Sequence, residues 1–78
     1  MVANLRIETQ ILDDQEWAFE HYAELTMKYS NQWVAIYNQQ VVASGPNLRQ
    51  VEAQAASKTG QAEEKIAVIF VEAGDQIF

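Results

Sequence analysis

The spacing of hydrophobic and polar positions changes several times along the chain, and each change predicts a new element of secondary structure. Residues 4–12 alternate, with apolar side chains at Leu5, Ile7 and Ile11 and polar ones between them. A period of two is typical of a β-strand. Because chain ends are often loosely held, residues 1–12 fit either an edge strand or a loose lead-in.

After residue 12 the spacing of apolar residues becomes that of a helix. Asp13 and Glu16 have the spacing of a capping box, and Leu12 and Trp17 occupy the two positions of a hydrophobic staple. Beyond this start, apolar side chains recur three or four residues apart, as on one face of a helix. They are Ala18, Tyr22, Leu25 and Tyr29. We therefore predict a helix over residues 14–29 that begins at Asp13.

Two short apolar runs come next, at residues 33–37 and 41–43, separated by three polar residues. This arrangement predicts a β-hairpin. Asn38 tolerates the positive φ of a primed turn, although the glycine that commonly follows it is replaced by Gln39.

The last part of the chain alternates again between helix and strand signals. Asn47 is a good N-cap and Gly60 a good C-terminal cap, so we predict a second helix over residues 48–58. The apolar run at 66–71 predicts a final strand.

These elements form one α+β domain over residues 1–78, in the order (β)-α-β-β-α-β. The simplest sheet has three antiparallel strands in the order 2-1-3, with the first hairpin strand in the centre. The strands at 33–37 and 66–71 are apolar on both faces. In a sheet with one face in solvent, apolar and polar residues would alternate along each strand. We therefore expect either helices on opposite faces or a second subunit on one of them.

Composition and charge restrict the function. Eleven acidic residues oppose five basic ones, giving a net charge of −6, which disfavours binding to nucleic acid or to an anionic membrane. The chain has no cysteine and a single histidine, His21, so we predict no metal site and no cofactor. No motif of a catalytic centre is present, so we predict a protein that is not an enzyme. No signal peptide is recognised, and a cytoplasmic location is expected.

Aromatic residues are numerous for so small a domain, and aromatic side chains favour interfaces and ligand pockets as well as cores. The candidates for an interface or a pocket are Trp17, Tyr22, Tyr29, Trp33, Tyr37 and Phe70. A pocket would lie between the helix at 14–29 and the sheet.

The hairpin sequence resembles a family of small bacterial and archaeal domains of unknown function. Their pattern is W-[VI]-A-x-x-x-G-x-V-[VI]-A-x-G, and the resemblance covers residues 33–71. The matching residues are Trp33, Val34, Ala35, Val41, Val42, Ala43 and Gly45. Gln39 departs from the glycine of the pattern, which leaves the turn type open. The resemblance implies a ββαβ core and carries over no catalytic residue.

Three functions follow as expectations. The first is a non-catalytic protein-interaction or regulatory module, which self-associates or binds another protein. We expect a homodimer that uses the sheet or segment 4–11. The second is a domain that binds or senses a small molecule in an aromatic pocket. The third is an antitoxin-like partner of a neighbouring gene product.

Overall fold

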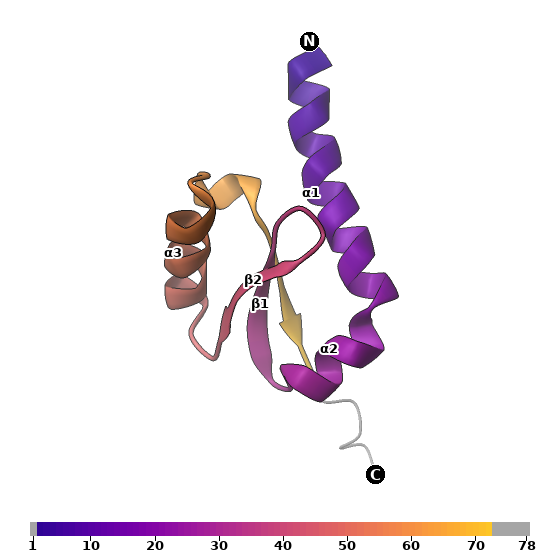
Figure 1. Ribbon diagram of the computed structural model, residues 1–78, viewed down its shortest axis with the longest axis vertical. Coiled ribbons are helices and arrows are strands. Elements are labelled where there is room, and N and C mark those ends of the chain that lie inside the picture. The colour runs from indigo at the N-terminus through magenta and orange to yellow at the C-terminus, as the bar shows by residue number, and fades with distance from the viewer. Residues whose placement is uncertain (1, 73–78) are drawn as a thin grey trace.

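A computed structural model describes residues 2–72 of the chain. The helices and strands follow one another along the chain as α1 (Val2–Glu20), α2 (Tyr22–Lys28), β1 (Gln32–Ile36), β2 (Val41–Gly45), α3 (Leu48–Thr59), the 3-10 turn η1 (Glu63–Lys65) and β3 (Ala67–Val71). Within residues 2–72 the strands form one antiparallel sheet in the order β2-β1-β3 (Figure 1). The predicted α+β class and strand order are confirmed.

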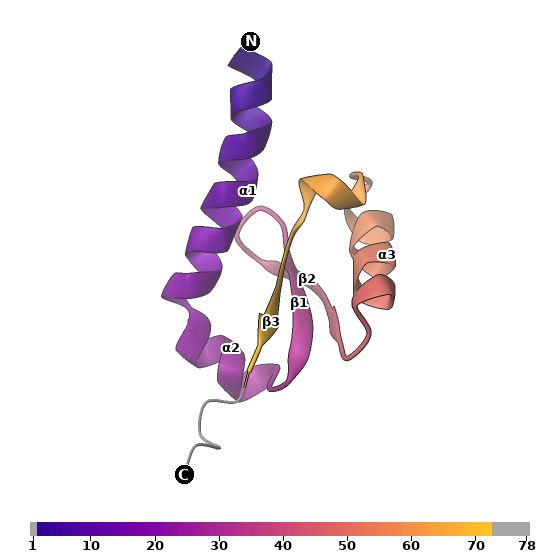
Figure 2. The same ribbon diagram turned by 180° about the vertical axis from the view of Figure 1, so that it is seen from behind.

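Helices cover both faces of the sheet. Helices α1 and α2 lie on one face and α3 on the other, as both views of the ribbon show (Figures 1 and 2). The strands that are apolar on both faces are therefore covered by the protein's own helices. The N-terminal half of α1 extends past the sheet (Figure 1).

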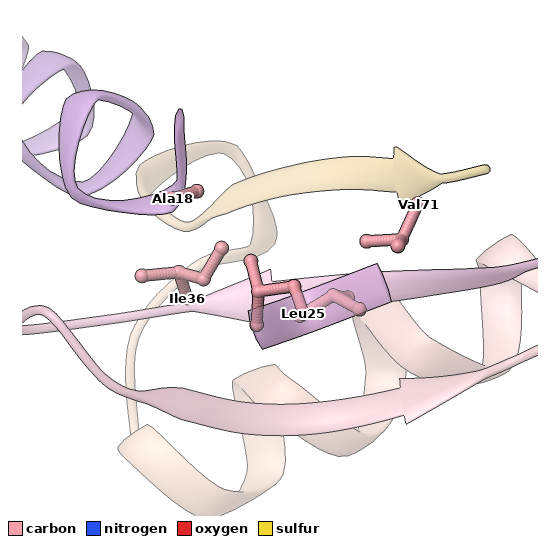
Figure 3. Packing of buried hydrophobic residues seen from close by; sticks show 5 residues of the cluster. Ala18, Leu25, Ile36 and Val71 are labelled. Carbon is pink, nitrogen blue, oxygen red and sulfur yellow. The ribbon is translucent and has the colours of Figure 1, made fainter. Parts of the chain in front are cut away.

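The core on the α1 and α2 face draws on four elements. Ala18 of α1, Leu25 of α2, Ile36 of β1 and Val71 of β3 point toward one another (Figure 3). Ile36 and Val71 are completely inaccessible to solvent. On the opposite face, α3 forms a second core. This core contains Ala35, Val51, Ala55 and Ile66.

The prediction for residues 1–12 is wrong, because α1 runs without interruption from Val2 to Glu20. Ile7 and Ile11 are four residues apart, so over this short stretch the alternation also fits a helix. Farther along α1, Asp14 and Ala18 are buried, three and seven residues after Ile11, as on one face of a helix. No glycine or proline interrupts residues 2–20.

The predicted helix start at Asp13 is also wrong. Asp13 lies in the middle of α1 and is exposed, and the proposed staple residue Leu12 is 62% exposed. The predicted helix over 14–29 is divided at His21, where α1 gives way to α2. The His21 ring stacks on Trp17, with 4.5 Å between ring centroids, and its Nδ1–H donates to the Trp17 carbonyl at 2.8 Å. A side chain that bonds the preceding turn competes with regular helical geometry.

The hairpin forms as predicted, with a primed turn and a bulge. Asn38 and Gln39 both have positive φ, at 54° and 60°, which is the signature of a type I′ turn. Ala35 pairs with Ala43 while Ile36 pairs with Val41, so Val42 is an extra residue in β2. The bulge turns neighbouring β2 side chains to the same face, because Val42 and Ala43 both pack on the α3 core.

The predicted caps of the second helix are confirmed. The Asn47 side chain accepts a hydrogen bond from the Gln50 amide at 3.1 Å, and Gly60 ends α3 in the left-handed conformation with φ of 73°. The helix ends one residue later than predicted, at Thr59.

Candidate interaction surfaces

A hollow of the described structure follows the free edge of β2. It measures about 750 Å³. Its floor is β2 itself, from Val41 to Ser44. Tyr29, just after α2, forms the wall on one face of the sheet. Residues of α3 form the wall on the other face, and they are Ala53, Gln54, Ser57 and Lys58.

The backbone at this edge has hydrogen-bonding groups to offer. Among the described strands, β2 pairs only with β1. Tyr37 and Gln40 exchange two backbone hydrogen bonds, of 2.9 and 3.3 Å, that close the hairpin. The next pair, Ile36 and Val41, is then a non-hydrogen-bonded pair, because the two types alternate along an antiparallel ladder. The N–H and C=O of Val41 therefore point away from β1, toward the hollow.

The hairpin at this edge also carries no charge. No acidic or basic residue occurs between Lys28 and Arg49, although 21% of the chain is charged. Edge strands of soluble proteins are commonly protected by charged side chains, which prevent pairing with other chains. Strand β3 at the opposite edge is also uncharged from Ala67 to Val71, with Lys65 and Glu72 just beyond its ends. On β2 no residue of the strand is charged and, within residues 2–72, Lys58 is the only charged residue that lines the hollow, so this edge is suited to accept another strand.

The aromatic residues predicted as one interface or pocket are spread over the whole molecule. Trp17, Tyr22 and Tyr29 pack against the core on the α1 and α2 face. Of the predicted residues, Tyr29 alone lines the hollow along β2.

The remaining aromatic candidates lie on the α3 face. Trp33 and Tyr37 pack against the α3 core, and the ring of Phe70 meets Trp33 edge-on with 5.1 Å between centroids. Phe70 is 38% exposed, so this pair reaches the surface beside α3. On the other face, the Tyr22 hydroxyl accepts a hydrogen bond from the Glu72 amide at 3.0 Å. These aromatic residues mainly hold the layers together.

Residues of α3 complete the hollow, and sequence reasoning missed them. In the sequence, Ala53, Gln54 and Ser57 have the pattern of the solvent-exposed face of a short helix. Whether they contact β2 depends on how α3 crosses the sheet, and the residue pattern of one helix does not specify that crossing. The available signal was the run of uncharged residues from Tyr29 to Leu48, which spans the entire hairpin.

A buried carboxylate holds the hairpin turn against α1. Asp14 is 1% exposed, and its oxygens accept hydrogen bonds from the amides of Gln39 at 2.9 Å and Asn38 at 3.2 Å. The Gln10 side chain donates to the Asn38 side chain at 2.7 Å. A buried carboxylate is stable only when its oxygens are hydrogen-bonded, and this one is. The Asp14 carboxylate thus joins two elements that are far apart in the sequence.

Replacing Gln39 with glycine is expected to stabilise the protein by about 0.5–1 kcal/mol. Gln39 has a left-handed backbone, in which its Cβ is strained, whereas glycine adopts this conformation freely. Gln40 is not among the described residues with positive φ, so Gln40→Gly is the matched control and is expected to lower stability. Urea unfolding midpoints of the two variants would move in opposite directions. Equal losses would contradict this account of the turn.

Across residues 2–72, no group of three or more His, Cys, Asp or Glu side chains is arranged to hold a metal ion. None of the helices in that part of the chain combines the length and the apolar character needed to cross a membrane.

Comparison with known proteins gives a family and no activity. No curated protein and no solved structure matches the chain. Residues 24–74 match the family described as "Family of unknown function (DUF5678)". The matched range begins within α2 and includes the whole sheet, α3 and the hollow along β2. Since the match spans more than half of the chain, the protein belongs to the DUF5678 family.

Proposed function

We propose that the domain is a non-catalytic protein-interaction module that binds an extended strand along the free edge of β2. The observation that carries this proposal is the hollow of about 750 Å³ that follows the edge and has a wall on each face of the sheet. A strand added to a sheet lies in the plane of that sheet. It gains main-chain hydrogen bonds from the edge and side-chain contacts on both faces.

The chemistry of the hollow agrees with such a ligand. Outward backbone groups of Val41 can pair with the backbone of the incoming strand. Ser44, Gln54 and Ser57 offer hydroxyl and amide groups, and Val42 offers apolar surface. Lys58 is the charged member of this lining, so a carboxylate in the bound strand would be favoured beside it.

The proposal can be tested by selecting binders from a phage-displayed library of random heptapeptides. We expect the selected peptides to be extended and to shift the amide resonances of residues 41–45 and 53–58 of the labelled protein. Ala53→Glu, which places a charge in the wall of the hollow, should weaken binding at least about tenfold. Ala62→Glu is the matched control, since it makes the same substitution at an exposed residue beyond α3 that does not line the hollow, and it should leave binding unchanged.

Other results of this selection would overturn the proposal. Peptides that instead shift resonances on the acidic surface of α1 would place the binding surface there. A selection that yields no binder to the folded protein would argue against a strand-binding edge altogether.

A second candidate is favoured by the size of the hollow. Its volume lies within the roughly 300–1,000 Å³ of small-molecule sites, and its lining combines apolar and polar groups. Screening a fragment library by resonance shifts distinguishes the two functions. Small-molecule binding predicts saturable shifts at Tyr29, Ser44 and Ser57 with fragments, without any bound peptide.

A further inference from the structure

We infer that the strand bound along β2 is β2 of a second copy of this chain, so that two sheets join into one across a two-fold axis. This inference rests on the function proposed above and names its partner. A two-fold interface brings one surface onto itself, so that surface must be self-complementary. The edge of an antiparallel strand meets this requirement, because each strand presents both N–H and C=O groups to the other.

Charge favours the edge of β2 over the rest of the surface for self-association. Each copy has a net charge of −6, and acidic residues of α1 such as Asp13, Glu16 and Glu20 are exposed. Two copies that met through α1 would bring like charges together. The hairpin contributes no charge from Tyr29 to Leu48, and Lys58 is the one charged residue of the described chain that lines the hollow, so two copies that approach along β2 meet less like charge than two copies that approach through α1.

The position of α3 is compatible with such pairing. Val51 and Ala55 pack on Ala35 of β1 as well as on Ala43 of β2, so the helix lies over both strands. Paired strands are about 4.8 Å apart, and packed helices need roughly 8–10 Å between axes. The two α3 helices would therefore run close together on one face, which small side chains allow.

The side chains at that helix contact are small. Ala53 and Ser57 are four residues apart, line the hollow and are exposed. A five-residue strand is only about 17 Å long, whereas a stable interface needs roughly 600–1,000 Å² on each copy. The helix pair and the Tyr29 side chains on the other face would supply the remaining area.

The bulge at Val42 limits the length over which a second strand can pair with β2. A bulge interrupts the regular ladder and twists the edge, so a partner strand can pair only over a short segment. The other edge of the assembled sheet is β3, which is flanked by Lys65 and Glu72. These features favour a closed dimer over a growing fibre.

Sedimentation equilibrium of the full chain tests the inference. Between about 10 µM and about 500 µM, the mass should rise from the 8.8 kDa monomer to twice that value. Ala53→Glu should weaken dimerisation at least about tenfold, because two glutamates then face each other across the axis. Ala62→Glu should dimerise like the unmodified chain. Hydrogen exchange at the Val41 amide should slow as concentration increases.

The outcomes separate this inference from the proposed function. A chain that stays monomeric at the highest concentration, while selected peptides bind along β2, overturns the second copy as partner and leaves the function standing. A monomer that also binds no peptide overturns both. A dimer that Ala53→Glu does not weaken, or whose protected amides lie outside β2, uses another surface and contradicts the inference.

Discussion

Asp14→Ala is expected to destabilise the fold by about 2–4 kcal/mol, since hydrogen bonds to charged groups contribute about 1.5–3 kcal/mol each and two are lost. Removing the carboxylate also removes its own cost of burial, which keeps the net loss below the sum. The amides of Asn38 and Gln39 would lose their partner in a turn that already has positive φ. A domain of this size has roughly 3–5 kcal/mol of stability, so much of the protein would unfold.

Asp13→Ala is the matched control for this variant. Asp13 is the neighbouring residue, has the same side chain and is exposed in the middle of α1, so its replacement should change stability by less than about 0.5 kcal/mol. Chemical denaturation measures both losses, and hydrogen exchange reports on the amides of Asn38 and Gln39 directly. If Asp13→Ala proved as damaging as Asp14→Ala, the contact between α1 and the hairpin turn would not be the cause.

Ile36→Ala is expected to cost about 2–5 kcal/mol, because it removes a completely buried side chain from the centre of the sheet. Ile36 lies in β1 and packs in the same cluster as Ala18, Leu25 and Val71, so the cavity would loosen α1, α2 and β3 together. The lost free energy is comparable to the whole stability of the domain. Circular dichroism at 25 °C should show a largely unfolded chain.

Leu12→Ala provides the comparison for Ile36→Ala. It also shortens an aliphatic side chain to alanine, but Leu12 is 62% exposed, and the expected loss is below about 0.5 kcal/mol. An unfolding midpoint for Ile36→Ala that stayed close to the unmodified chain would show that the core between the helices and the sheet is less tightly packed than described.

Some features of this fold follow from local sequence signals, and others depend on contacts between segments that are distant in the chain. The hairpin, the caps of α3 at Asn47 and Gly60, and the two-sided burial of β1 and β3 follow from residues close together in the chain. Asn38 predicted the primed turn, since its backbone tolerates positive φ. The start of the first helix was misjudged because Asp13 and Glu16 have cap spacing, while nothing local reveals that α1 already runs through them.

The candidate site could be predicted only in part. The short uncharged strand at 41–43 is visible in the sequence, and in the structure it borders the hollow. The walls of the hollow could not be foreseen, because the contact of α3 with β2 and the position of Tyr29 arise from packing across the sheet. The same holds for Asp14, whose partners Asn38 and Gln39 are 24 and 25 residues away.

The sequence by itself determined the hairpin, α3, β3 and the need to cover both faces of the sheet, because periodicity and caps act over a few residues. The tertiary structure decided which helix covers which face, since either helix could bury its apolar side against either surface. It also decided that Asp14, and not its neighbour, meets the hairpin turn, because a rotation of 100° per residue along α1 places one carboxylate inward and the other in solvent. The edge of β2 stays open because the helices pack on the two faces of the sheet and not along its edge. No local pattern in the sequence indicates which edge is left uncovered.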